Sequence, residues 1–183
     1  MQTRRNLLRM TTGILIGATG WWLGAGRGRA EIAPGTKPAQ PLDWRPLSLP
    51  KEEWKKLVSA KAYYVLFEEG TERAYSSDLD DEKRSGTYVC AACYLPLFGS
   101  EAKFDSGTGW PSFFEPIEGR LGTSRDYKLV FPRTEYHCAR CGGHQGHVFE
   151  DGPKPTGLRY CNNGVALAFV PEGESLPALR RKA

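Results

Sequence analysis

The sequence carries little excess charge of either sign outside its first thirty residues. The 183-residue chain has a formal charge of +4, but residues 1–30 contain five arginines and no acidic residue. Without that segment, 20 lysines and arginines face 21 aspartates and glutamates. A protein that binds nucleic acid through its phosphates needs a strongly basic face. The charge balance of the body therefore predicts no nucleic acid partner.

The sequence is also poor in histidine, and it shows no internal repeat or low-complexity segment. Its length suits one domain with appendages. All 3 histidines lie in the stretch HCARCGGHQGHVF at 137–149, and two of the 5 cysteines lie there too. This clustering marks 137–149 as the stretch around which a functional site is organised.

A long apolar run is missing as well. The apolar segment 10–26 spans about 17 glycine-rich residues, which is short for a membrane-spanning helix. It follows a basic start and precedes Gly28-Arg29-Ala30, the layout of an export signal. Arg4 and Arg5 resemble a twin-arginine signal. We expect export to the periplasm, cleavage near Ala30 and membrane contact only during export; a retained anchor is the alternative.

The rest of the chain predicts a mainly β domain with short helices at its start. Residues 31–50 contain five prolines and are expected to form a linker or extended arm. Helices are expected from about Lys51 and over 63–69. The domain is expected to cover 51–171, followed by a polar tail at 172–183. Short β-type runs bounded by turn residues predict strands at 88–90, 97–98, 128–131, 135–138, 146–149, 158–161 and 165–170.

Four of the cysteines form two Cys-x-x-Cys pairs. Cys90 and Cys93 make the first pair, and Cys138 and Cys141 make the second. Each pair places two sulfurs on a tight turn, which suits a tetrahedral zinc site that leaves no open coordination position. The spacing thus predicts one structural Zn²⁺, with disulfide bonds as the alternative for an exported protein.

The fifth cysteine, Cys161, has no partner in either pair. Arg159 would share its face in a strand, and a guanidinium there favours the thiolate. The turn residues that follow, Asn162-Asn163-Gly164, place the sulfur near solvent. A catalytic thiol is one interpretation, and a buried core thiol is the other.

Two further groups could complete a catalytic site around Cys161. His144 and His147 could supply protons near neutral pH, or they could be structural imidazoles or additional metal ligands. The glycine-rich loop 104–113 ends in aromatic residues. It could be a packed turn, or it could present Trp110 to a small apolar group of a ligand.

These segments together resemble one family. The stretches TERA (71–74), FDSGTGWPSF (104–113), GHQGHVF (143–149) and GLRYCNN (157–163), with both Cys-x-x-Cys pairs, are similar to the methionine-R-sulfoxide reductases, MsrB. The likeness runs from about residue 50 to 170. It implies a β-tent of two antiparallel sheets with a zinc ion clamping one end.

The resemblance also implies a role for each candidate residue. Cys161 would attack the sulfoxide sulfur of an oxidised methionine and become a sulfenic acid. His144 and His147 would protonate the sulfoxide oxygen. The remaining roles are hydrogen bonding within the site by Asn163, thiolate stabilisation by Arg159, and binding of the substrate methyl group by Trp110 with Phe149 as a further wall.

Thr108 departs from the family pattern, because many members carry a resolving cysteine in this loop. With four cysteines assigned to zinc, an external thiol would reduce Cys161, either a thioredoxin-like protein or a small molecule. Preference for the R epimer rests on the resemblance, and a monomer is the default expectation. Other interpretations are a zinc-binding scaffold without catalysis, and a thiol peroxidase or disulfide exchanger that uses Cys161.

Overall fold

The computed structural model describes residues 44–128 and 131–181. They belong to one compact unit, Pro41–Ala183. The expected export signal in 1–30 and the first part of the proline-rich segment lie outside the described residues. No helix within the described ranges has the length and hydropathy to cross a membrane.

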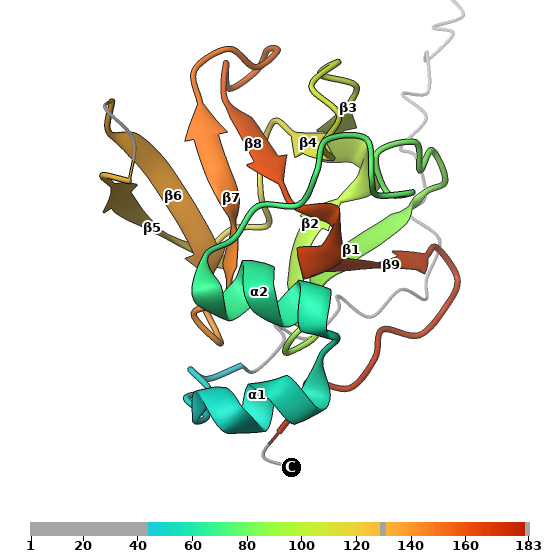
Figure 1. Ribbon diagram of the computed structural model, residues 1–183. Helices are drawn as coiled ribbons and strands as arrows, with labels where there is room; N and C mark the ends of the chain where they lie inside the picture. Colours follow the sequence, from blue (N-terminus) through green and yellow to red (C-terminus); the bar gives the residue numbers. More distant parts are fainter. Residues whose placement is uncertain (1–43, 129–130, 182–183) are drawn as a thin grey trace, which may run out of the picture. The chain divides into compact units, whose positions relative to one another are not determined.

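The unit is built mainly from two antiparallel β-sheets, as expected from the sequence (Figure 1). One sheet has three strands in the order β2-β1-β9, and the other has six in the order β3-β4-β8-β7-β6-β5. The strands are β1 (Gly86–Cys90), β2 (Pro96–Gly99), β3 (Lys103–Phe104), β4 (Ser112–Phe113), β5 (Leu121–Asp126), β6 (Arg133–Cys138), β7 (His144–Phe149), β8 (Arg159–Asn162) and β9 (Leu167–Pro171). The 3₁₀ turns η1 (Ser100–Ala102) and η2 (Gly164–Ala166) precede β3 and β9.

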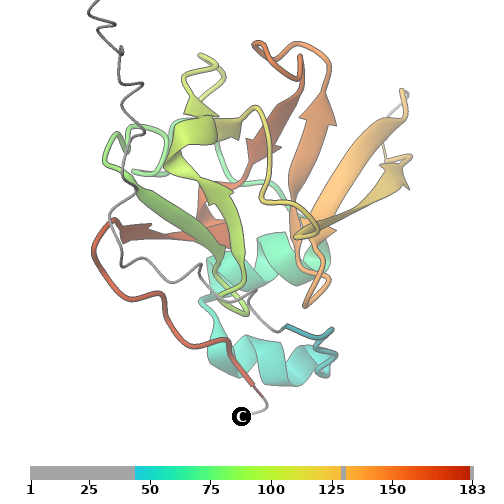
Figure 2. The same ribbon diagram turned by 180° about the vertical axis from the view of Figure 1, so that it is seen from behind.

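Two short helices lie at one end of the sheets, as the two opposite views show (Figures 1 and 2). Helix α1 (Lys51–Leu57) follows Pro50 and buries Trp54. Helix α2 (Ala60–Glu68) begins three residues before the expected start at 63. Ser59 explains the difference, because its hydroxyl accepts the backbone N–H of Ala62 and caps the first turn.

The strand expected at 128–131 is wrong at its two described residues, and residues 129–130 lie outside the described part of the chain. Strand β5 lies earlier, at Leu121–Asp126, and Lys128 and Phe131 are in bends. The Asp126 carboxylate accepts the backbone N–H of Lys128 at 2.8 Å, a local side-chain bond that is typical of a turn rather than of a continuing strand. The apolar composition of 128–131 indicates a strand, but Phe131 is 80 % exposed.

The last strand also begins later than expected. Residues 164–166 form η2, and β9 starts at Leu167. The Glu72 carboxylate accepts the backbone N–H groups of Gly164 and Val165, so these groups bond to a distant side chain rather than to a neighbouring strand. The alternation of apolar residues over 165–170 gives no sign of this competing partner.

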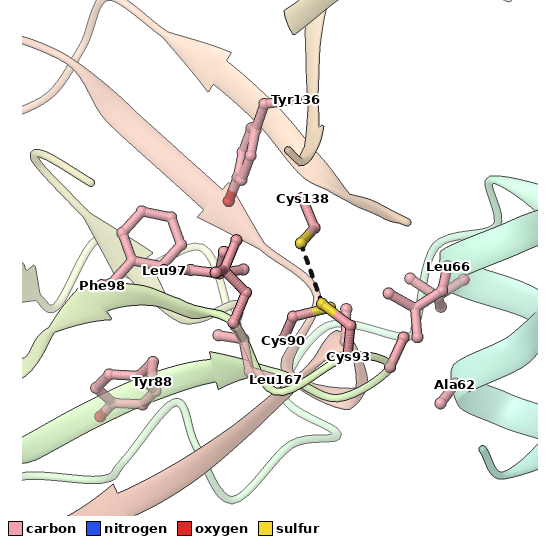
Figure 3. Close-up of a cluster of buried hydrophobic side chains, with 14 of the residues drawn as sticks. Ala62, Leu66, Tyr88, Cys90, Cys93, Leu97, Phe98, Tyr136, Cys138 and Leu167 are labelled. Carbon is pink, nitrogen blue, oxygen red and sulfur yellow. Dashed lines mark hydrogen bonds between the residues drawn. The ribbon is translucent and has the colours of Figure 1, made fainter. Parts of the chain in front are cut away.

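The core brings the two sheets and α2 together around the paired cysteines. Figure 3 shows Cys90, Cys93 and Cys138 between Leu66 of α2 and the large side chains of the sheets, among them Tyr136. All three cysteines are fully buried. The paired cysteines therefore lie in the hydrophobic core rather than on a surface loop.

The segments that flank the domain pack beside this cluster. The backbone N–H of Leu47 donates to the Arg140 carbonyl at 2.6 Å, and the backbone N–H of Arg180 donates to the Cys93 carbonyl at 3.1 Å. The Arg140 guanidinium in turn donates to the Arg180 carbonyl at 2.6 Å. Residues of the proline-rich arm and of the polar tail thus converge on Arg140.

Candidate active site and metal centre

The four paired cysteines form one cluster at which the two sheets meet. Cys90 ends β1 of the smaller sheet, and Cys138 ends β6 of the larger sheet. Their sulfurs and those of Cys93 and Cys141 all lie within 4.8 Å of one another. The Sγ atoms of Cys93 and Cys138 are 3.5 Å apart, and those of Cys90 and Cys141 are 3.7 Å apart.

These separations fit a metal ion better than disulfide bonds. A disulfide requires about 2.05 Å between sulfurs, whereas four sulfurs in tetrahedral array at about 2.3 Å from a metal lie roughly 3.8 Å from one another. Burial raises the pKa of the Cys90 thiol, so thiolates here need a nearby cation. The cluster can hold a metal ion, and four sulfur ligands would leave it no open position.

Cys161 lies away from this cluster, in a separate small cleft. Strand β8 places it opposite Ser112 of β4 and His147 of β7, its register partners on either side. The thiol is half-buried. The cleft has a volume of about 120 Å³, and its walls include Trp110, His147, Phe149, Cys161 and Asn163. The structure therefore brings together five of the residues singled out in the sequence.

Opposing effects act on the Cys161 thiol. Burial raises its pKa, while the Arg159 guanidinium and a hydrogen bond with Thr108 lower it. Arg159 is held by two 2.8 Å bonds to the Asp151 carboxylate and lies 4.3 Å from the centre of the Phe149 ring. The cation is thus fixed beside the sulfur, where it favours the thiolate.

The two candidate proton donors each have a carboxylate partner. His144 Nδ1 lies 2.9 Å from Glu135 Oε1, and His147 Nε2 lies 2.7 Å from Asp126 Oδ2. The ring centres of the two histidines are 5.4 Å apart. His147 lines the Cys161 cleft, whereas His144 lines a neighbouring hollow that His147 also borders. The third histidine, His137, lies 3.5 Å from Glu135.

Trp110 and Asn163 are fixed by the backbone of one distant segment. Trp110 Nε1 donates to the Glu72 carbonyl at 3.2 Å, and Asn163 Oδ1 accepts the Glu72 N–H at 2.9 Å. The amide nitrogen of Asn163 donates to the Gln145 carbonyl at 2.9 Å. The Asn163 side chain therefore ties the Glu72 segment to β7.

Three acidic residues of the site were missed by sequence reasoning about individual residues. Asp126 and Glu135 come from β5 and β6, and nothing local in the sequence links them to the histidines. Glu72 lies in the TERA stretch, so the family resemblance pointed to its segment but not to its contacts. Their roles depend on strand pairing, which a single sequence does not reveal.

Comparisons with known proteins agree with this geometry. The SelR domain matches residues 58–171. Over 125 residues the chain is 51% identical to the peptide methionine sulfoxide reductase MsrB of Methanosarcina barkeri, covering 68% of this chain and 88% of that protein. It is 52% identical to MsrB of Pseudomonas putida over 121 residues, 66% of this chain and 91% of the relative.

A plant relative shows the same likeness over a smaller share of its length. Peptide methionine sulfoxide reductase B1, chloroplastic, of Arabidopsis thaliana is 50% identical over 121 residues, which are 66% of this chain and 60% of that protein. The domain match extends over both the four-cysteine cluster and the Cys161 cleft. The chain belongs to the SelR domain family, that of the MsrB peptide methionine sulfoxide reductases.

Proposed function

We propose that this protein reduces the R epimer of methionine sulfoxide in proteins, as a peptide-methionine (R)-S-oxide reductase. The observation that carries the proposal is the pairing of Cys161 with His147 across β7 and β8, in a cleft walled by Trp110 and Phe149. A nucleophile, a proton donor and an apolar wall thereby meet in a space suited to a small group.

The first step transfers oxygen from methionine to cysteine. The Cys161 thiolate attacks the sulfoxide sulfur, and His147, assisted by His144, protonates the sulfoxide oxygen. The sulfur–oxygen bond of the substrate breaks, and the oxygen ends on Cys161 as a sulfenic acid. The substrate sulfur gains two electrons and the Cys161 sulfur loses two, so the products are methionine and the Cys161 sulfenic acid.

Chain residues around these atoms orient the reactants. Trp110 contacts the substrate methyl group, with Phe149 as a further wall of the cleft. Arg159 stabilises the thiolate before attack, and Asn163 holds the hydrogen bonds that place β7 beside the Glu72 segment.

An external thiol completes the cycle. Two thiols convert the sulfenic acid into a free Cys161 thiol, a disulfide of the reductant and water. Thr108 supplies no sulfur, although its side chain is close enough to lower the pKa of Cys161. Because the other four cysteines lie together in the cluster that can hold a metal ion, a thioredoxin-like protein or a small thiol is the proposed reductant.

The metal proposed for the cluster is zinc. Cys90, Cys93, Cys138 and Cys141 would hold one Zn²⁺, which would supply structural cross-linking between the sheets. The proposed location is the periplasm, reached through a twin-arginine signal in 1–30. That route exports folded proteins, so the ion could bind before the thiols meet an oxidising compartment. The protein is proposed to act as a monomer.

The test compares the two separated sulfoxide epimers of a methionine-containing peptide as substrates. We expect the wild type to reduce the R epimer with thioredoxin or dithiothreitol, and Cys161→Ser to lose this activity with its metal still bound. If neither epimer is reduced with any reductant, the domain is a metal-binding scaffold. Reduction of hydrogen peroxide without activity on sulfoxide would identify a thiol peroxidase.

A further inference from the structure

The side chain of His147, the histidine opposite Cys161, hydrogen-bonds to Asp126. Within the described part of the chain, this is its only side-chain hydrogen bond. We propose that Asp126 is a positioning residue for the reduction: it fixes the orientation and tautomer of His147, so that Nδ1 of the ring exchanges the proton with the Cys161 cleft. This inference rests on the proposed function, because it assigns His147 the proton transfer to the sulfoxide oxygen.

The Asp126 carboxylate is itself held on both oxygens. Oδ1 accepts the backbone N–H of Lys128 at 2.8 Å. Oδ2 is 2.6 Å from an Arg133 guanidinium nitrogen and 2.7 Å from His147 Nε2. The side chain is only 10% exposed. A carboxylate bound on both oxygens cannot rotate freely, so it can hold the imidazole in a single orientation.

The position of Asp126 separates it from the substrate. His147 borders both the Cys161 cleft and the neighbouring hollow of about 320 Å³, whereas Asp126 lines only that second hollow. His147 therefore borders both the hollow that Asp126 lines and the cleft that Cys161 lines. Because the carboxylate occupies Nε2, Nδ1 is the ring nitrogen left for the cleft. Asp126 acts through His147 rather than on the reacting atoms.

Charged and titratable groups face His147 from four strands. They are Asp126 of β5, Arg133 and Glu135 of β6, His144 of β7 and Cys161 of β8. Burial lowers the pKa of His147, the Asp126 bond opposes that effect by raising it, and Arg133 and His144 lower it further. Among these neighbours, the Asp126 carboxylate is the group that raises the pKa of His147 and so favours its protonated form.

The substitution Asp126→Asn removes the charge and preserves the shape of the side chain. In metal-loaded protein with isotope-labelled histidine, we expect the NMR titration of His147 to move to lower pH. In the pH–rate profile of R-sulfoxide reduction, the fall in rate at alkaline pH should begin at a correspondingly lower pH. At a fixed pH in that range, the rate should be about tenfold lower for each pH unit of displacement. KM should be unchanged, as should the Cys161 alkylation profile.

Two further variants separate this effect from damage to the fold. Arg133→Met removes a cation that lowers the pKa of His147, so its titration should move to higher pH, the opposite direction. Asp81→Asn removes an exposed carboxylate outside the site and should leave the titration unchanged. A general loss of structure would not produce shifts of opposite sign.

A His147 titration that is the same in wild type and Asp126→Asn would overturn the proposal. A rate lowered equally at every pH would also overturn it, because that result indicates a structural role alone. The titration needs no substrate. If wild type reduced no sulfoxide but the titration still shifted, the proposed function would fail while the control of His147 by Asp126 would stand.

Discussion

The backbone N–H of Glu72 donates a 2.9 Å hydrogen bond to Oδ1 of Asn163, a residue 91 positions away in the sequence. The Glu72 carboxylate accepts the N–H groups of Gly164 and Val165 just beyond it. Through its carbonyl, Glu72 also holds Trp110. One residue therefore connects the aromatic wall of the cleft with the turn that follows Cys161.

Substitution of Glu72 tests this connection. Glu72→Ala leaves two backbone N–H groups without their acceptor, and a buried donor without a partner costs about 1–3 kcal/mol. We expect the free energy of unfolding to fall by about that amount in chemical denaturation, with slower sulfoxide reduction. Glu69→Ala is the control, because its exposed ion pair with Lys128 is worth about 0–1 kcal/mol. Equal losses in both variants would contradict the assignment.

Arg159→Met should make the Cys161 thiol less acidic. The Arg159 guanidinium lowers the pKa of Cys161 against the effect of burial, so removing it raises that pKa. The alkylation rate of Cys161 by iodoacetamide should then rise at a higher pH than in wild type, with the other four cysteines shielded by metal. Arg159→Lys retains the charge and should show a smaller displacement. Identical profiles for all three proteins would exclude this role of Arg159.

Thr108→Cys should create an internal route for reducing the sulfenic acid. The Thr108 side chain is close enough to lower the pKa of Cys161, so we expect a thiol at this position to reach the oxidised sulfur. After one turnover, mass spectrometry should detect a disulfide between the introduced thiol and Cys161 in the variant, and a sulfenic acid in wild type. Thr123→Cys places a thiol on exposed β5 and serves as the control. A persistent sulfenic acid in Thr108→Cys would refute the prediction.

Metal removal should destabilise the domain as a whole. The cluster joins β1 and β6, the ends of two different sheets, and three of its four cysteines are fully buried in the core. We expect a strong chelator, or Cys138→Ser, to lower Tm sharply and broaden the transition seen by circular dichroism. Metal analysis should show one ion per chain before treatment. An apo protein with the same Tm as the metal-loaded form would show that the ion contributes nothing to folding.

Sequence patterns predicted the parts of the fold that depend on local chemistry. The two Cys-x-x-Cys pairs, the strands around His147 and Cys161, and the position of α1 all follow from spacing and neighbouring turn residues. Strand β5 was missed because residues 123–125 are polar and exposed on both faces, so they lack the alternation that marks a strand. The strands β3 and β4 have only two residues each, too few to form a pattern.

The parts of the site that could not be predicted depend on contacts between distant segments. Asp126 reaches His147 across β6, the strand that separates β5 from β7 in the sheet. Glu72 reaches Asn163 from a loop after α2. A polar residue on a strand or loop has many possible partners, and only the pairing order of the strands selects one. Cys161 could be singled out from the sequence because its own neighbours, Arg159 and the turn residues after it, favour a reactive thiol.

The convergence of the flanking segments on Arg140 has a consequence for biosynthesis. The bond from Arg180 to the Cys93 carbonyl can form only after the ribosome has translated residue 180, long after both Cys-x-x-Cys turns have been made. Its donor lies 39 residues after Cys141, so this contact is among the last that the chain can form around the cysteine cluster during synthesis.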